Sequence, residues 1–491
     1  MKATRGCWTC KKRKIGCDKT LPGCNNCART GRECAGYGCR ISWPDESRKR
    51  ARDLIICTTS TTTDVASHPP GTRRAFLNFT FGDYGFSNKH LTWRRYLSEA
   101  YPAPAMPMSL HTPVVGEDAS YLAYYDRVIA PMCSTTRARN GFQCQVLPLV
   151  LSSCDASADS LRASILAISA YHRQQLGTAL TYKTNAMGLF RKSLTNSMPG
   201  ASAEVTMTQL STCMMLCMHS VFDEHEENFR LHLDAAKHIF RNLSQEQQKH
   251  PLSRFLAEWI LYYDVLCDFA EPKRDTQSGQ RIELYLLSSQ PSDVIIGIIG
   301  CSGEVFDAMR HVNRLRRTRC EPGDAYTSEA ILEQRFQLEM VLQKATQRIN
   351  PADVNTKEDT PTERIMATAQ LYRLATLLYL LRAVPDAADE GRRRSYLNEA
   401  FMALRRTGVA TSPWAVFVVA CESRRDTERS FMLDVLDKMV EARNIGNIRV
   451  LRTIVEAIWK QQDIADNANS SPDASPTWPT TDYGIPVPWY A

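Results

Sequence analysis

Apolar residues recur at helical spacing through most of the chain from Glu117 onward. Positions 122, 125, 128, 129 and 132 are apolar, and the same three- and four-residue steps join Leu161, Ile165, Ile168 and Tyr171. Further helices are expected at 205–222, 226–243, 252–269, 293–316, 326–349, 362–383 and 428–460. The alternation typical of strands is scarce, so the pattern predicts an all-α body of roughly ten or more helices.

The remainder of the chain lacks this periodicity and divides by composition. Residues 57–75 are rich in Thr and Ser and contain Pro-Pro-Gly, which is typical of a flexible tether. No heptad repeat is sustained within residues 44–115, so monomeric binding stays open, and a homodimer would form through the helical body. We expect five segments: a cysteine-rich domain at 1–43, a basic and then Thr/Ser-rich linker at 44–75, an irregular connection at 76–116, the all-α body at 117–462, and an acidic, Pro- and aromatic-containing tail at 463–491, expected to be disordered.

Positive charge is concentrated at the N-terminus. The whole chain carries a net charge of +7, yet residues 1–56 contain 14 Lys and Arg against five Asp and Glu. A basic head on a near-neutral body is typical of a polyanion-binding module joined to a second domain. The 17 cysteines are spread along a chain with no apparent signal peptide, which favours a reducing compartment. The longest apolar runs, 294–301 and 415–421, are too short to span a bilayer, so a membrane partner is not expected.

Six cysteines near the N-terminus form a direct repeat. Their spacing is C-x2-C-x6-C-x6-C-x2-C-x6-C, with a period of seventeen, and the positions are Cys7, Cys10, Cys17, Cys24, Cys27 and Cys34. Each half offers three sulfurs, whereas a structural zinc requires four ligands, and the first histidine is the distant His68. Six thiolates can complete two zinc sites if two sulfurs bridge, and the first cysteine of each half, Cys7 and Cys24, is the natural bridge. The count therefore predicts two Zn²⁺ per chain; a disulfide framework is the alternative.

The stretch CWTCKKRKIGCDKTLPGCNNCARTGREC, residues 7–34, resembles the fungal Zn2Cys6 binuclear cluster, the DNA-binding domain of many fungal transcription factors. The resemblance implies a small domain of two short helices around two zincs. It also implies that Cys7, Cys10, Cys17 and Cys24 hold one zinc and that Cys24, Cys27, Cys34 and Cys7 hold the other. Pro22 matches the proline of the family's connecting loop, where it is cis, whereas Gly16 departs from the basic residue often found before the third cysteine.

The cations inside the repeat point to DNA. Lys11, Lys12, Arg13 and Lys14 are consecutive, so they cannot all turn toward the metals, and Lys and Arg neutralise phosphates or bond guanine in the major groove. The resemblance implies that Arg13 and Lys14 read a CGG triplet. The second half carries only Arg29 and Arg32, which are expected to contact the phosphate backbone of the DNA. A second basic patch, Arg48, Lys49, Arg50 and Arg52, is a candidate nuclear-import signal or further phosphate contact; the alternative is a solvated charge run.

The helical body offers no catalytic motif. Stretches at 229–240, 255–266, 297–315 and 413–423 resemble the regulatory domain that accompanies the cluster in one branch of the family. Neither G-x-S-x-G nor the P-loop sequence occurs. Five soft side chains on one expected helix, with His219 nearby, could suggest a nucleophile or soft-metal site, but Cys and Met at such positions usually pack helix cores. They are Cys213, Met214, Met215, Cys217 and Met218.

The sequence therefore indicates a nuclear, zinc-dependent, sequence-specific DNA-binding regulator of RNA polymerase II transcription, not an enzyme. Its fold class is a small binuclear zinc-cluster domain joined to a large all-α regulatory domain. Expected partners are double-stranded DNA with CGG-containing sites, coactivators or corepressors, and a second copy bound through the body. Two alternatives stay open: a zinc module that binds another protein without reading DNA, and an enzyme in which the zinc module is accessory.

Overall fold

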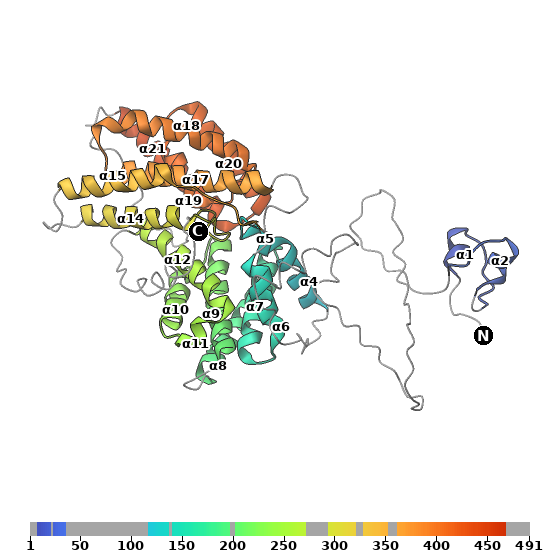
Figure 1. Ribbon diagram of the computed structural model, residues 1–491. Helices are drawn as coiled ribbons and strands as arrows, with labels where there is room; N and C mark the ends of the chain where they lie inside the picture. The colour runs from blue at the N-terminus through green and yellow to red at the C-terminus, as the bar shows by residue number, and fades with distance from the viewer. Residues whose placement is uncertain are drawn as a thin grey trace. The chain divides into compact units, whose positions relative to one another are not determined.

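The computed structural model describes residues 7–20, 23–35, 116–136, 140–196, 202–271, 293–320, 328–351 and 361–467 (Figure 1). The chain separates into two compact units at about residue 100. The expectations for the linker 44–75, the connection up to residue 115, Pro22, the basic patch 48–52 and most of the tail lie outside the described residues.

The N-terminal unit contains two short helices separated by the repeat period. They are α1 (Trp8–Lys12) and α2 (Asn25–Arg29), and they contact each other. Each begins directly after the first cysteine of its half, so the cysteine repeat is also a repeat of secondary structure. The two short helices expected from the resemblance are present.

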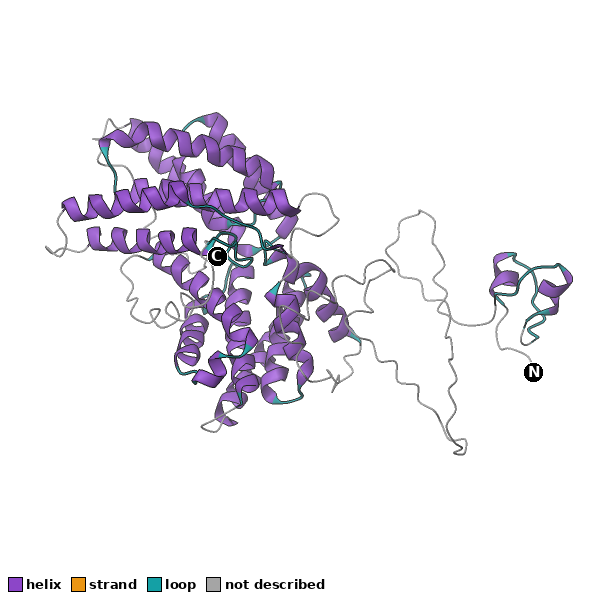
Figure 2. Cartoon of the chain, viewed as in Figure 1, coloured by secondary structure: helices purple, strands orange, loops and turns teal. Residues whose placement is uncertain are grey.

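The body is all-α in its described part, as predicted. Figure 2 shows helices and loops there, and the β-type pairing among the described residues of the body is two isolated bridges, Val294 with Arg348 and Ile295 with Ser302. Its first half comprises α4 (Glu117–Tyr124), a π-helix at Tyr125–Ile129, α5 (Ala130–Met132), a second π-helix at Phe142–Val146, α6 (Leu147–Ser152), α7 (Ala156–His172), α8 (Leu176–Asn196), α9 (Ala203–Phe222), α10 (Phe229–Arg241), α11 (Gln245–Gln248) and α12 (Pro251–Ala270). Its second half comprises α14 (Gly303–Cys320), α15 (Ser328–Lys344), α17 (Pro361–Ala383), a 3-10 turn at Ala387–Asp389, α18 (Glu390–Thr407), α19 (Pro413–Glu422), α20 (Asp426–Arg443) and α21 (Gly446–Asn467).

The core is organised by α19, which is wholly buried, and by α9, which is buried beyond its first turn. In the first half α9 packs against α7, α10 and α12, and in the second half α19 packs against α17, α20 and α21. A helix that is apolar on every face must be surrounded, and every residue of α19 is buried, as are residues 207–222 of α9. The halves, teal to green and yellow to red in Figure 1, join through α12 with α14 and α9 with α21.

The cysteines and methionines of α9 are core residues, as predicted. Cys213, Met214, Met215 and Cys217 have no exposed surface. Burial raises the pKa of the Cys213 thiol to about 12, which keeps it in the unreactive protonated form. Among the described residues, no helix is both apolar and long enough to cross a bilayer.

The predicted helix at 293–316 is wrong at its start. Residues 293–302 form an irregular turn, and α14 begins only at Gly303. Gly300 has a φ of 92°, and a Cβ at this position would lie 2.9 Å from the Tyr372 ring. The backbone therefore leaves the helical region at a glycine that packs directly against α17, which a periodicity argument does not capture.

The predicted helix at 428–460 is two helices. Asn444, with a φ of 49°, ends α20, and its N–H donates to the Val440 carbonyl over 2.8 Å. Asparagine tolerates the left-handed region better than most residues, so the chain turns there and restarts as α21. The helices α8, α18 and α19 were not predicted, because glycines interrupt α8, charges dominate α18, and α19 is too uniformly apolar to show a period.

A buried ion pair between α10 and α12 gives a stability test. Lys237 is 1% exposed, and its Nζ lies 2.7 Å from Asp264 Oδ1. Lys237→Met leaves the Asp264 carboxylate without this cation and should cost about 3–5 kcal/mol, seen as a lower thermal midpoint. Arg452→Met, which breaks the exposed pair with Asp437, is the control and should cost less than about 1 kcal/mol. Equal midpoints for the two variants would contradict the assignment of a buried pair.

Candidate metal centre

The two cysteine halves have matching local structure. Cys7 is the N-cap of α1, and its sulfur accepts a hydrogen bond from the Cys10 N–H at 3.4 Å; Cys24 caps α2 and accepts from the Cys27 N–H at 3.3 Å. The third cysteine of each half is held alike: the Cys7 N–H donates to the Cys17 sulfur at 3.3 Å, and the Cys24 N–H donates to the Cys34 sulfur at 3.4 Å. N–H donors at a helix N-terminus favour an anionic acceptor, so both halves are arranged for thiolates.

Four sulfurs converge at the centre of this unit. The distances from the Cys7 sulfur to those of Cys24 and Cys27 are 3.5 and 3.8 Å, and those from Cys10 to the same two sulfurs are 3.6 and 4.0 Å. All four side chains are buried, and Cys17 and Cys34 pack against them. Zn–S bonds of about 2.3 Å in a tetrahedron separate neighbouring sulfurs by about 3.8 Å, so the observed spacing suits zinc.

The chemistry of these thiols also fits a soft divalent metal. Burial raises the pKa of Cys7 to about 12 and raises those of Cys10 and Cys24, whereas the Cys7 N–H lowers the pKa of Cys17 to about 7. Buried sulfurs this close cannot all ionise without a nearby cation. A metal ion reverses that preference, because a coordinated thiol loses its proton. The donor set and the spacing therefore fit Zn²⁺.

Reciprocal hydrogen bonds lock the halves together. Thr9 donates its hydroxyl to the Glu33 carbonyl at 3.1 Å, and Asn26, seventeen residues later, donates its amide to the Gly16 carbonyl at 2.7 Å. Gly16 and Glu33 are themselves one period apart, so the pairing has approximate two-fold symmetry. Both carboxylate oxygens of Asp18 accept the Asn25 N–H at the start of α2. The structure thus fixes the relative position of the two helices through side chains as well as sulfurs.

The cations that the sequence singled out lie around this core. Lys11, Lys12 and Lys14 are exposed at the end of α1, and Arg29 and Arg32 are exposed at the end of α2. Arg13 is half-buried, and its Nη1 donates to the Thr30 hydroxyl at 3.2 Å across the two halves. The unit therefore presents cations from both helices while holding one of them in place.

The termini of α1 and α2 share a feature that sequence reasoning missed. The Ile15 N–H donates to the Cys10 carbonyl, and the Arg32 N–H donates to the Cys27 carbonyl. These bonds close both helices with a Schellman turn. The left-handed residue of that turn is Lys14 in the first half, with a φ of 54°, and Gly31 in the second, with a φ of 61°. Gly31 lies one seventeen-residue period after Lys14, and this match was the sequence signal from which a left-handed residue at Lys14 could have been predicted. Lys14 adopts a conformation that costs a non-glycine residue roughly 1 kcal/mol.

The body also contains a small polar cluster. His219, Asp223 and Glu226 bring ligand-type atoms within 4.8 Å of one another at the end of α9. Lys183 of α8 forms an ion pair with Glu226, so the cluster already has a cation supplied by the protein. Burial and the neighbouring Lys183 lower the pKa of His219 to about 4, which leaves its imidazole neutral.

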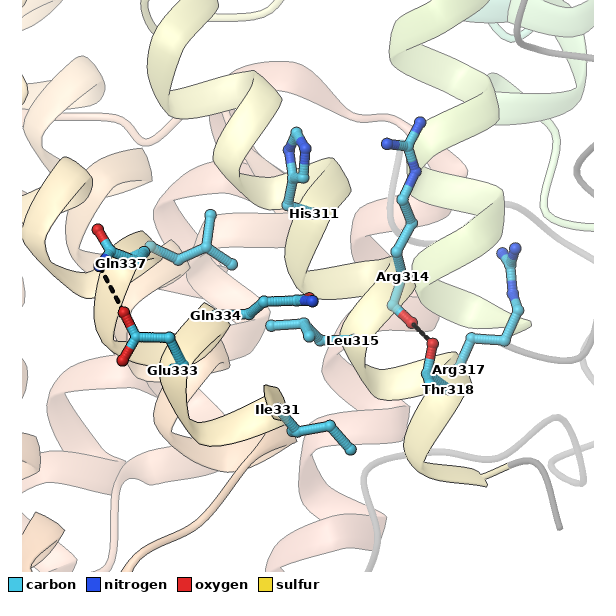
Figure 3. A pocket seen from close by; sticks show the side chains of 10 residues that line it. His311, Arg314, Leu315, Arg317, Thr318, Ile331, Glu333, Gln334 and Gln337 are labelled. Atoms are coloured by element: carbon cyan, nitrogen blue, oxygen red, sulfur yellow. Dashed lines mark hydrogen bonds between the residues drawn. The ribbon is translucent and has the colours of Figure 1, made fainter. Parts of the chain in front are cut away.

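A groove of about 620 Å³ lies between α14 and α15 (Figure 3). His311, Arg314 and Arg317 line one wall, and Glu333 and Gln337 line the other. Figure 3 shows two contacts within single helices, from the Thr318 hydroxyl to the Arg314 carbonyl and from the Gln337 amide to Glu333. Residues 321–327, between the two helices, lie outside the described part of the chain.

Comparisons with known proteins give a consistent picture. The family model described as the fungal Zn(2)-Cys(6) binuclear cluster domain matches residues 5–44, and that of the fungal specific transcription factor domain matches residues 120–484. The transcription factor iacI of Pestalotiopsis fici is 25% identical over 323 residues, 63% of this chain and 79% of that protein. White-opaque regulator 2 of Candida albicans is 48% identical over 51 residues, 10% of this chain and 11% of that protein. Transcriptional regulatory protein moc3 of Schizosaccharomyces pombe is 59% identical over 32 residues, 6% of each chain. No solved structure matches the chain significantly.

The left-handed residue in each half predicts opposite effects of glycine and alanine. Lys14→Gly should stabilise the metal-loaded cluster by about 1 kcal/mol, because glycine adopts a positive φ without strain. Gly31→Ala should destabilise it similarly, although a Cβ there meets no atom within 4 Å. The measurement is the chelator concentration that removes half of the metal from the purified chain.

Lys14→Ala is the control, because it removes the charge but keeps the strained backbone. If Lys14→Gly and Lys14→Ala resist the chelator equally, the strain at Lys14 is absent and the interpretation is wrong.

Proposed function

The chain belongs to the fungal-specific transcription factor family and carries its Zn(2)-Cys(6) cluster domain, and we propose that it regulates RNA polymerase II transcription in the nucleus by binding CGG-containing DNA. Members of this family are zinc- and DNA-binding regulators of transcription, not enzymes. The observation that supports the proposal most strongly is that cysteines of both halves form one buried cluster, with exposed cations around it.

The proposed metal content is two Zn²⁺ per chain. Cys7, Cys10, Cys17 and Cys24 would hold one ion, and Cys24, Cys27, Cys34 and Cys7 would hold the other. The 3.5 Å separation of the Cys7 and Cys24 sulfurs supports their sharing both ions. Zinc bonding would supply folding free energy that a segment of this size cannot obtain from an apolar core. The residues themselves position the helices through the Thr9 and Asn26 hydrogen bonds.

The proposed DNA contacts divide between bases and phosphates. Arg13 and Lys14, at the end of α1, would read guanines, because a guanidinium or ammonium group can bond guanine O6 and N7. Lys11, Lys12, Arg29 and Arg32 would neutralise phosphates. Arg13 would have to exchange its hydrogen bond with Thr30 for one with a base, so Thr30 holds this side chain before DNA binds. With Gly16 before the third cysteine, one further phosphate contact is lost.

A homodimer through the body is the proposed assembly. Four apolar residues of α8 are strongly exposed, and three of them, Leu180, Met187 and Leu194, repeat every seven residues on one face. A seven-residue apolar repeat is typical of helix pairing, so a second copy of α8 is a suitable partner for this stripe. Coactivators or corepressors remain further proposed partners of the regulatory domain.

Sequence-specific DNA binding is tested by changing cations of the two halves separately. Arg13→Ala should reduce the preference for a CGG duplex over a scrambled duplex by about 1–3 kcal/mol, with the zinc content unchanged. Arg32→Ala, the control, should weaken binding to both duplexes alike and make the salt dependence shallower. Binding is measured by fluorescence anisotropy over a salt series.

Two outcomes would separate the alternatives. Unchanged preference in Arg13→Ala would overturn the assignment of a base contact. Absence of DNA binding by the zinc-loaded wild type would favour the second candidate function, a zinc module that binds another protein.

The α8 stripe is tested by sedimentation. The wild type should show a mass that rises toward a dimer with concentration, and Leu180→Glu with Met187→Glu should remain monomeric, because buried charge opposes pairing. Phe336→Glu on α15, also an exposed apolar position, is the matched control and should behave as wild type. A wild type that is monomeric throughout, or a double variant that still dimerises, would contradict the α8 interface.

A further inference from the structure

Arg443, the last residue of α20, is a partly buried cation without an acidic partner among the described residues. Its Nη1 donates to the Thr411 carbonyl at 2.9 Å and its Nη2 to the Met132 carbonyl at 2.8 Å. Its Nε–H is buried and has no hydrogen-bond partner, and no carboxylate of the described residues pairs with it. The fully buried cations Arg335 and Lys237 are paired with Asp389 and Asp264. A buried N–H donor normally has a hydrogen-bond partner, so the Nε–H of this partly buried guanidinium needs an explanation.

The titratable groups near Arg443 do not supply the missing negative charge. Burial raises the pKa of the Cys133 thiol to about 11 and that of the Tyr262 phenol to about 12. The pKa values of Tyr263 and Tyr372 are raised further for the same reason. All four groups are therefore neutral near pH 7. Burial also lowers the pKa of Arg443, but a guanidinium stays protonated in proteins.

Arg443 lines a cavity of about 70 Å³ where the two halves of the body meet. The polar residues of its lining include Tyr262 and Tyr372, whose hydroxyls are 3.1 Å apart, together with Ser412 and Thr411. The Thr411 hydroxyl is buried and, like the Arg443 Nε–H, has no partner. The apolar residues of its lining include Phe142, Met218, Val221, Phe222 and Trp259. The lining thus combines a cation and hydroxyls with hydrocarbon.

We propose that this cavity binds a short-chain monocarboxylate, of the size of acetate or propionate, with the carboxylate on Arg443 and the alkyl group against apolar side chains of the lining. A carboxylate would accept the Nε–H and compensate the guanidinium charge, and hydroxyls of Thr411 or Tyr262 would donate to it. Water could satisfy the hydrogen bonds but not the charge. The volume is about half that of an apolar cavity known to admit benzene, so it suits a few heavy atoms and excludes an aromatic acid.

Ligand binding here would act on the packing of the whole body. Arg443 ties α20 to the end of α5 and to the segment before α19, and the cavity wall also includes residues of α9, α12 and α17. A ligand that binds only the folded arrangement stabilises it by an amount that grows with the logarithm of the ligand concentration once that concentration exceeds Kd. The regulatory domain would then respond to the concentration of a small organic acid, independently of which DNA sequence the cluster reads.

The test is the thermal midpoint of the full-length, zinc-loaded protein in sodium acetate, propionate, benzoate or chloride at equal ionic strength. We expect the midpoint to rise with the logarithm of acetate and propionate concentration once the site begins to fill, whereas benzoate and chloride should leave it unchanged. An equal response to all four salts, or no response to acetate and propionate, would overturn the proposal.

Variants locate the site. Arg443→Gln should abolish the carboxylate response, and if this variant does not fold, Tyr262→Phe with Tyr372→Phe removes only two hydroxyls and should weaken the response at least tenfold. Tyr379→Phe is the matched control, because its hydroxyl bonds Asn313 away from the cavity, and it should respond as wild type. A double Tyr variant that responds as strongly as Tyr379→Phe would place binding elsewhere and overturn the assignment.

Discussion

The meeting of cysteine sulfurs between α1 and α2 is the constraint on which the N-terminal unit depends. Its two helices have five residues each, too short to persist alone, and the cluster formed by their side chains consists of cysteines rather than ordinary apolar residues. The sulfurs sit at helix N-caps and accept backbone N–H groups, so the same residues that would hold metal also begin the helices. Metal binding would consequently be coupled to formation of the helices, and with it to the exposed arrangement of Lys11 to Lys14.

The helical body follows different physics. It is held by α9 and α19, which are surrounded on every side, and by ion pairs such as that of Lys237 and Asp264. Its cavity at Arg443 departs from that plan, because a partly buried cation there has a buried Nε–H without a hydrogen-bond partner. A departure of this kind from the usual satisfaction of buried polar groups is expected at sites that bind a ligand. The two units therefore combine a metal-ordered DNA module with a body that has its own candidate ligand site.

The sequence predicted the elements whose signal is local and periodic. The seventeen-residue repeat was sufficient to pair Cys7 with Cys24, and the apolar steps from Leu161 to Tyr171 correspond to α7. It failed where a single backbone conformation decides the outcome, as at Gly300 and Asn444. The strained Lys14 was recognisable in principle, since Gly31 occupies the matching position. The surroundings of Arg443 were not recognisable from the sequence, because they come from α5, α12, α17 and α20, and no local sequence pattern relates these helices.

The most direct test of the account is the metal content of the intact chain, purified under reducing conditions and weighed by native mass spectrometry. Shared sulfurs at Cys7 and Cys24 require two zinc ions per polypeptide. A single zinc per polypeptide would mean that four sulfurs close one ordinary site, and it would contradict the binuclear centre from which the DNA-binding surface is derived.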